Sequence, residues 1–498
     1  SVFGRSVYSY RILITDLPTY LSLNKTMSTR KDFMTQKMDT PTFAPFAEKM
    51  KTEGLPELVI EVFQYYYNQL VAGETGFISS TEAQPVTSLP DAAQFDNHYM
   101  AVGREALNRA VVLKLNGGLG TGMGISGPKS LITVKEDLSF LDIIIKQIQY
   151  LRTQYHARLP LVLMNSFNTQ EATLAKLVEI DDFAQDIPYD FLQHKEPKVD
   201  ANSLHPISWP HDPEKEWCPP GHGDIYPALI TSGILQQLLD AGYEYVFVSN
   251  ADNLGATLNL AILGYVAEEA SLGRLPFLME VADRTPADKK GGHLAQRSDG
   301  QLILREIAQC PPDEIDCFQN IAHYRYFNTN NLWLHLPTLQ NVLVERHGVL
   351  GLPLIRNTKT VDPTDPDSPK VYQLETAMGS AIGIFGGAQA IRVPRDRFVP
   401  VKRNNDLLLL WSDVYQLTDD GHLIVNPERT LPLPQIDLDT RYYGRIDDLR
   451  TRFPHGAPSL LNCTSLTVRG DVCFGDGVTL VGEQVFVQEE EEQLKVES

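Results

Sequence analysis

The chain has 498 residues, which is long for a single hydrophobic core, and two or three domains are expected. Its net charge of −20 argues against nucleic acid or an anionic membrane as a partner. No apolar run approaches the ~18 residues that span a bilayer. The five cysteines form no CxxC pair, so they indicate neither a disulfide framework nor a zinc site. They fit a reducing compartment, either the cytoplasm or an organelle such as a glycosome.

The N-terminal part divides into two regions. Residues 1–40 are rich in Ser, Thr, Lys and Arg and poor in acids, which predicts a disordered extension, a transit peptide or a leader foreign to the natural protein. Residues 41–105 are expected to form a helical region. Its apolar residues recur near 3.6-residue spacing between 45 and 73, at Phe46, Met50, Leu55, Leu58, Val62 and Tyr66.

Strands and helices alternate from residue 106 to about 395, where we expect the main domain. Alternation on this scale predicts an α/β fold with a doubly wound, mainly parallel sheet and a ligand at the carboxyl ends of its strands. The expected strands are 110–115, 161–164, 245–249 and 275–281, and the expected helices are 140–150, 225–239 and 258–269.

A different period marks the C-terminal region, 396–498. Apolar residues recur every six positions, which is typical of a parallel β-helix built from hexapeptide repeats. A pair of ordinary hairpins is the alternative. The repeating positions are Val468, Phe474, Leu480 and Phe486, together with Leu466, Val472 and Val478.

The strand at 110–115 opens directly into a loop with six glycines between Gly117 and Gly127, closed by Lys129. Glycines leave backbone amides accessible, and successive amides form a concave site for anions. Gly122, Gly124 and Gly127 have the spacing of the dinucleotide-binding motif G-x-G-x-x-G. However, it begins too far after the strand, and Pro128 follows where a helix should run. Pro128 also separates Gly127 from Lys129, which excludes a simple P-loop.

The run Leu115-Asn116-Gly117-Gly118-Leu119-Gly120-Thr121-Gly122-Met123-Gly124, followed by Gly127-Pro128-Lys129-Ser130, resembles the nucleotide loop of the eukaryotic UTP–glucose-1-phosphate uridylyltransferase family. This resemblance implies a Rossmann-like mixed sheet of the nucleotidyltransferase, glycosyltransferase A-like type, with a left-handed parallel β-helix at the C-terminus. It also implies nucleotide contacts from Leu115, Asn116, Gly117, Gly118 and Lys129.

Asn250-Ala251-Asp252-Asn253 follows the apolar strand at 245–249. A carboxylate in this place suits Mg²⁺, which takes few protein ligands and completes its shell with water and phosphate. An Asx turn or a helix cap is the alternative. The resemblance implies that Asp252 binds the metal and that Asn250 contacts the nucleotide.

His222 lies between two glycines just before an expected helix, where backbone amides face anions. By itself it also fits an ordinary polar contact. The family motif implies that Gly221 meets the nucleotide and His222 the sugar phosphate. The family reads uracil with the glutamine that matches Gln193, and Met164 matches a segment near the base.

Three amides lie within four residues at Asn328, Asn330 and Asn331, where turn-forming asparagines are the alternative. The resemblance places Asn330 and Asn328 at the hexose. Gly292 and Glu375 match segments on the sugar side, although a surface loop and a core position fit them equally well. Lys402 matches the catalytic, phosphate-stabilising lysine of the family, with Lys129 on the other side of the triphosphate.

The reaction that the resemblance implies is UTP plus glucose 1-phosphate giving UDP-glucose plus pyrophosphate, reversibly and with Mg²⁺. The sugar phosphate attacks the α-phosphorus in line, so catalysis consists of alignment and charge neutralisation. Two alternatives stay open: a pyrophosphorylase for N-acetylglucosamine 1-phosphate or several sugar phosphates, and a sensor that binds the nucleotide sugar without turnover. Self-association through the C-terminal domain is a further expectation.

Overall fold

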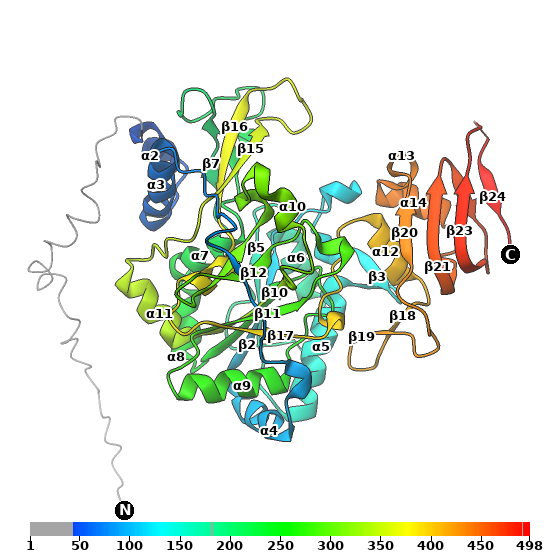
Figure 1. The fold of residues 1–498 in the computed structure, drawn as a ribbon, viewed down its shortest axis with the longest axis horizontal. Coiled ribbons are helices and arrows are strands. Elements are labelled where there is room, and N and C mark those ends of the chain that lie inside the picture. The colour runs from blue at the N-terminus through cyan, green and yellow to red at the C-terminus, as the bar shows by residue number, and fades with distance from the viewer. Residues whose placement is uncertain (1–42, 181–182, 491) are drawn as a thin grey trace, which may run out of the picture.

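The computed structural model describes residues 43–180, 183–490 and 492–498. The extension expected over residues 1–40 lies outside these ranges and stays a prediction. Figure 1 shows a central α/β body with helices α2 (Ala44–Thr52) and α3 (Glu57–Val71) at one end and the C-terminal strands, in orange and red, at the other. Within the described ranges, no helix has the length and apolarity needed to cross a membrane.

A ten-stranded mixed sheet forms the centre of the molecule. Its strands are β1 (Gln84–Pro85), β2 (Ala110–Asn116), β5 (Leu161–Asn165), β6 (Asp190–Leu192), β10 (Tyr245–Asn250), β11 (Phe277–Asp283), β12 (His293–Gln296), β13 (Leu302–Arg305), β14 (Tyr326–His335) and β17 (Gln389–Arg392). The main path runs β1-β12-β14-β10-β2-β5-β6, and β11 pairs with β14 and β17. Strands β10, β2, β5 and β6 are parallel, whereas β14 is antiparallel to β10 and β11. The expected α/β fold with a partly parallel central sheet is confirmed.

Helices cover both faces of this sheet, with α5 (Phe140–Tyr155) and α9 (Leu260–Ser271) in one core and α7 (Ile225–Thr231), α8 (Ile234–Asp240) and α11 (Leu336–Glu345) in the other. The other α-helices of the described part of the chain, besides α2 and α3, are α4 (Asn97–Ala106), α6 (Gln170–Val178), α10 (Ile315–Phe318), α12 (Asn404–Trp411), α13 (Thr440–Tyr443) and α14 (Ile446–Arg452). The smaller sheets contain β3 (Thr133–Lys135), β4 (Leu138–Ser139), β7 (Glu196–Pro197), β8 (Val199–Asp200), β9 (Trp217–Cys218), β15 (Ile355–Thr360), β16 (Lys370–Glu375), β18 (Tyr415–Leu417) and β19 (Leu423–Val425).

Strand β2 is apolar almost throughout because helices cover both of its faces. Val112 belongs to the core that contains the buried residues of α5 and α9. Its neighbours Val111 and Leu113 belong to a second core, which contains the buried residues of α7, α8 and α11. This alternation is the two-residue period of a strand, and it anchors β2 in the middle of the molecule.

Two helical predictions need correction. The helix expected over 225–239 is two helices, α7 and α8, because the chain turns at Gly233 with a φ of +75°. The helical region after residue 45 breaks between α2 and α3, and α3 buries Val59, Ile60, Phe63 and Tyr67 rather than Leu58 and Val62. The other expected elements lie within two residues of their predicted bounds, except that α5 continues to Tyr155.

The C-terminal strands β20 (Gln435–Leu438), β21 (Ser459–Arg469), β22 (Val472–Phe474), β23 (Thr479–Val487) and β24 (Leu494–Val496) pair in parallel. Val468 lies opposite Phe486, three of the expected six-residue periods further along the chain. The repeat positions face inward: Phe486 is half-buried, and the others, Leu466, Val468, Val472, Phe474, Val478 and Leu480, are buried. These parallel pairings replace the antiparallel hairpins that were the alternative.

Helices α4 and α9 touch through their backbones at Gly103 and Gly264. A Cβ atom on Gly103 would overlap the carbonyl oxygen of Leu260, and one on Gly264 would overlap that of Tyr99. We therefore expect Gly103→Ala to lower the free energy of unfolding by about 1–3 kcal/mol, as overpacking does. Alanine is otherwise the better helix former, so a gain in stability would contradict this contact. Urea denaturation measures the change, and Gly386→Ala, with no heavy atom within 4 Å of the new Cβ, is the control.

Candidate nucleotide-sugar site

The carboxyl ends of β2, β5 and β10 lie together at one edge of the sheet. Leu115 is opposite Met164 of β5 and Asn250 of β10, and Asn116 is opposite Asn165. The side chain of Asn116 is buried and donates to Asn165 (2.7 Å) and Thr173 (3.0 Å). The Met164 side chain is also buried, in the core below the edge. These two side chains therefore build the floor of the site, and the backbone after Asn116 forms its surface.

The glycine-rich loop folds back on itself at this edge. Leu119 bridges to Pro128, and the amide of Lys129 donates to the carbonyl of Gly118 at 3.1 Å. A short 3-10 turn over Lys129–Leu131 follows, and the next α-helix, α5, begins only at Phe140. The helix that a dinucleotide fingerprint or a P-loop requires is thus absent after Gly127. Gly118 faces open space, with no heavy atom within 4 Å of a Cβ built there.

Lys129 and Asp252 meet across the edge. The Nζ atom of Lys129 lies 2.6 Å from Oδ2 of Asp252, and the two side chains are 16% and 22% exposed. The fold thus brings a predicted phosphate ligand into contact with the predicted metal ligand. The Oδ1 atom of Asn250 beside them is buried and has no hydrogen-bond partner among the described residues.

The segment before Lys402 is attached to the same place. The amide of Val401 donates to the carbonyl of Asp252 at 3.2 Å, and Pro400 bridges to Asn253. The amide of Lys402 donates to Asp406 in the first turn of α12 (2.7 Å), so the backbone at Lys402 is held on both sides. Its side chain is exposed.

Gln193, Gly117 and Gly221 form a second group beside the loop. The Nε2 atom of Gln193 donates to the carbonyl of Gly221 at 2.9 Å, and its Oε1 atom lies 2.9 Å from the position of a Cβ on Gly117. A Cβ on Gly221 would lie 2.5 Å from the carbonyl oxygen of Thr376, so only glycine fits there. Gln193 therefore connects the glycine-rich loop to the Gly221 loop.

His222 is held in one tautomer. The amide of Met378 donates to its Nδ1 atom at 3.0 Å, so Nδ1 carries a lone pair and the neutral ring has its proton on Nε2. Burial lowers the pKa of His222 to about 4, which keeps the ring neutral at pH 7. Glu375 lies close by, with its Cβ 3.1 Å from where a Gly221 Cβ would be, and burial raises the pKa of its carboxyl group.

Asn328 and Asn330 lie at a bulge in β14, where the register against β11 shifts between Glu280 and Val281. Asn330 has a φ of +59°, and the side chains of the two asparagines are hydrogen-bonded (2.8 Å). The amide of Asn328 donates to the carbonyl of Gly292 at 3.0 Å. The structure thus brings three predicted sugar-side residues together.

Two charged residues of this region were missed by the sequence analysis. Glu306 packs against Gly292, since a Cβ on Gly292 would lie 2.5 Å from its carboxylate, and burial raises the pKa of Glu306 to about 7 although nearby Lys402 opposes this. Lys114 is buried within β2 and donates to Ser249 (2.8 Å) and the carbonyl of Ala256 (2.7 Å). Burial lowers its pKa to about 7. The sequence could have indicated Lys114, because a lysine inside an apolar strand is unusual. The residues around Glu306 in the sequence do not indicate that it is buried.

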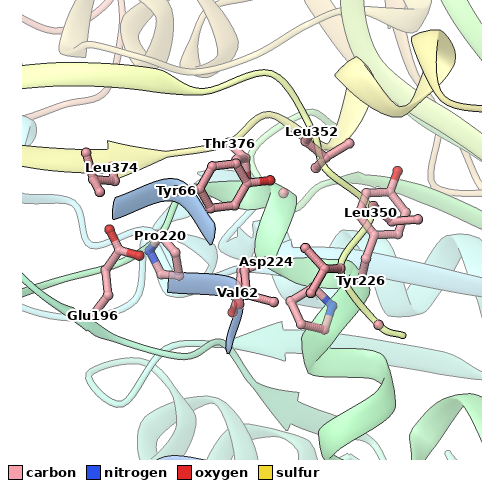
Figure 2. Close-up of a pocket in the computed structure, with 14 residues that line it drawn as sticks. Val62, Tyr66, Glu196, Pro220, Asp224, Tyr226, Leu350, Leu352, Leu374 and Thr376 are labelled. Atoms are coloured by element: carbon pink, nitrogen blue, oxygen red, sulfur yellow. The ribbon is translucent and has the colours of Figure 1, made fainter. Parts of the chain in front are cut away.

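A cavity of about 30 Å³ lies behind the Gly221 loop (Figure 2). Val62 and Tyr66 of α3 line it together with Glu196, whose Oε1 atom has no hydrogen-bond partner in the described part of the chain. Burial raises the pKa of Glu196 well above its ordinary value. The cavity has room for about one or two water molecules, so it is too small for a nucleotide.

The fold and the edge define an α/β protein with a glycine-rich loop, a lysine–carboxylate pair and a neutral histidine near the carboxyl ends of parallel strands. Comparison with known proteins gives the family: residues 60–481 match the family described as UTP–glucose-1-phosphate uridylyltransferase. The chain belongs to this family.

Individual relatives agree with this assignment. The UTP–glucose-1-phosphate uridylyltransferase of Solanum tuberosum is 44% identical over 381 residues, which cover 76% of this chain and 77% of the relative. That of Saccharomyces cerevisiae is 43% identical over 382 residues, covering 76% and 74%. Among solved structures, a mutant UDP-glucose pyrophosphorylase of Leishmania major in complex with UDP-glucose superposes with a TM-score of 0.82 at 42% identity, covering 93% of this chain and 100% of that one.

The neutral, half-buried His222 predicts a pH dependence of stability. Its pKa is about 4 in the folded chain and 6.5 ordinarily, so between these values the unfolded state binds more protons. The contribution of His222 to the free energy of unfolding is therefore complete above pH 6.5 and is lost as the pH falls towards 4. We expect the stability difference between the wild type and His222→Gln to shrink between pH 7 and pH 5 in urea denaturation. A difference that stays constant over this range would contradict a half-buried neutral ring.

Proposed function

We propose that the chain transfers the uridylyl group of UTP to glucose 1-phosphate, giving UDP-glucose and pyrophosphate. The convergence at one edge of the glycine-rich loop, the Lys129–Asp252 pair and the backbone that carries Lys402 is the observation that supports this most directly. An oxygen of the sugar phosphate forms the new bond to the α-phosphorus, and the bond from that phosphorus to the leaving pyrophosphate breaks. The attacking oxygen is already ionised, so the residues have only to align the substrates and offset their charge.

The nucleotide end is assigned to the glycine-rich loop and the Gln193 group. The backbone at Gly117 and Gly118 follows Leu115, and its amides donate to the phosphates, with Lys129 as their cation; Gly118 is open, whereas Gly117 is covered by Gln193. The Oε1 atom of Gln193 is left free to accept from uracil because Nε2 is used by Gly221. Asn250, whose buried Oδ1 has no hydrogen-bond partner among the described residues, is assigned a nucleotide contact.

The sugar-phosphate end is assigned to the opposite group. The Nε2–H group of neutral His222 donates to the phosphate, since Nδ1 is occupied by the amide of Met378. Asn328 and Asn330 at the bulge contact the hexose, together with the backbone at Gly292 and the carboxyl group of Glu375. Lys402 is assigned to the phosphates, where it stabilises the negative charge that develops as pyrophosphate leaves.

Mg²⁺ is the proposed cofactor, held by Asp252. Among the residues that the structure describes, no group of three or more His, Cys, Asp or Glu side chains could hold a metal ion. A single half-buried carboxylate fits Mg²⁺ nevertheless, because this ion keeps several waters and is bound largely through substrate phosphates. When bound, it neutralises phosphate charge.

We also propose a fold type for each of the two larger regions and a surface for self-association. The parallel strands within residues 396–498 support a left-handed β-helix, and the mixed sheet, which lies within 106–395 except for β1, supports a Rossmann-like domain of the nucleotidyltransferase type. Exposed valines on β23, such as Val481 and Val485, support self-association through this end of the chain.

Replacing the proposed catalytic lysine should slow the reaction itself. We expect Lys402→Ala to lower kcat by about 10²–10³-fold, the usual loss when one stabilising group of a transition state is removed, with a smaller change in KM for UTP. Steady-state pyrophosphate release measures both constants. Lys495→Ala removes an exposed lysine of β24 and should leave them unchanged. Unchanged kinetics in Lys402→Ala would remove this residue from its role.

Asp252→Ala should act on the metal. We expect the Mg²⁺ concentration for half-maximal rate to rise at least about tenfold, because the single protein carboxylate of the site is lost. Activity titrated with Mg²⁺ at saturating UTP gives this concentration. If its value matches the wild type, Asp252 does not bind the metal.

The activity is tested by pyrophosphate release from UTP with glucose, galactose and N-acetylglucosamine 1-phosphates side by side. Strong preference for glucose 1-phosphate is the expected result. Equal use of the three sugars would replace the assigned specificity with a broad one. Binding of UDP-glucose without turnover of any sugar phosphate would make the protein a sensor and refute the transferase.

A further inference from the structure

Lys402 and Asp252 are far apart in the chain, yet the proposed reaction needs them in one fixed arrangement. No hydrogen bond or ion pair joins their side chains in the described residues. Their relative position therefore depends on whatever fastens the segment 397–401 to the segment 252–253. The contacts between these two segments centre on Asn253, a residue to which the proposed function gives no role.

Asn253 is 1% exposed, and both ends of its carboxamide are used by the segment before Lys402. Its Nδ2 atom donates to the carbonyl of Arg397 at 3.1 Å, and its Oδ1 atom accepts from the amide of Val399 at 2.8 Å. The backbones add the bridge between Asn253 and Pro400 and the bond from Val401 to Asp252. One side chain thus bonds two backbone groups, two residues apart, in the segment that leads to Lys402.

The anchor point of this clamp is itself fixed. The guanidinium of Arg397 forms two 2.7 Å bonds with the fully buried carboxylate of Glu280, which also accepts from Trp333 (2.9 Å) and Asn331 (3.0 Å). Arg397 therefore keeps its place if the side chain of Asn253 is removed. The two segments also touch at Gly255, where a Cβ would overlap the carbonyl oxygen of Asp396.

We propose that Asn253 is a positioning residue for catalysis: its carboxamide sets the place of Lys402 relative to Asp252. This inference rests on the proposed function, because it gives Asn253 its effect through Lys402. Reactive groups must be held to within a fraction of an ångström, and a displacement of about 1 Å can cost about 100-fold in rate. Asn253 needs no contact with substrate to produce such an effect.

The test compares Asn253→Ala in the wild-type and Lys402→Ala backgrounds. In the wild type we expect kcat to fall by about 10- to 100-fold, with KM for UTP changed by less than about threefold. In the Lys402→Ala background the same substitution should change kcat by less than about threefold, because the group it positions is already gone. Single-turnover pyrophosphate release at high enzyme concentration measures the slow variants.

Asn426→Ala is the matched control. Asn426 is similarly buried (6% exposed), donates to the carbonyl of Asp413 (2.9 Å) and accepts from the amide of Glu428 (3.0 Å), but it lies in the C-terminal region. It should leave kcat unchanged. If Asn253→Ala does not fold, as thermal melting will show, Asn253→Asp serves instead: it keeps an oxygen that accepts from Val399, loses the donations to Arg397 (3.1 Å) and Asn331 (3.4 Å), and turns a carboxylate oxygen towards the Arg397 carbonyl.

The outcomes separate the two proposals. A loss of kcat confined to the background that retains Lys402 supports the positioning role. Equal losses in both backgrounds, or the same loss in Asn426→Ala, would overturn that role while Lys402 keeps its own. Full activity of Lys402→Ala alone would overturn the assigned role of Lys402, and the positioning role with it.

Discussion

The parallel alignment of β2 between β5 and β10 is the constraint on which the rest of the site depends. Parallel strands end at the same edge, so the glycine-rich loop and the Asp252 segment begin as neighbours. A register shift of one residue would turn every side chain of β2 to the opposite face. Val111 and Val112 belong to different cores, so such a shift would mismatch both. The packing of apolar side chains well below the edge therefore decides where the polar groups of the site lie.

Charged groups buried beneath the edge add a second layer of control. Glu280 is fully buried, and its partners come from β14 and from the chain beyond β17. Burying an ion pair costs desolvation, and apolar replacements of the same volume are often neutral or stabilising. The pair fixes the segment that carries Arg397 against β11. Lys114 also joins separate segments, since it donates to Ser249 of β10 and to the carbonyl of Ala256.

Much of the fold could be predicted because its signals are local. Strands β2, β5 and β10 are short apolar runs followed by turn residues, and the six-residue period of the C-terminal region is visible in the printed sequence. Asp252 was singled out because a carboxylate at the carboxyl end of a buried strand suits Mg²⁺, and the family resemblance decided between that interpretation and an Asx turn or helix cap. The reaction itself came from the resemblance to a family, since no single residue of the site specifies uridine or glucose.

The missed features depend on contacts between distant segments. The bulge at Asn330 exists only against β11, and the raised pKa of Glu306 reflects burial that its neighbours in sequence do not indicate. The buried face of α3 is set by Val199, Leu354 and Leu374, which arrive from other parts of the chain. The helix predicted over 225–239 failed for a local reason: apolar periodicity continued through Gly233, although the backbone turns there.

The tip of the glycine-rich loop has a consequence for how this chain can change over evolution. Gly124 has a φ of +74°, and a Cβ there would lie 2.9 Å from the Cβ of Arg445, between α13 and α14. The loop and the C-terminal region thus share a packing boundary, although they are distant in sequence. Only a glycine at 445 would remove that Cβ and make room for a side chain at 124, with asparagine or aspartate the most easily accepted because they tolerate a positive φ. The two positions should therefore vary together among relatives.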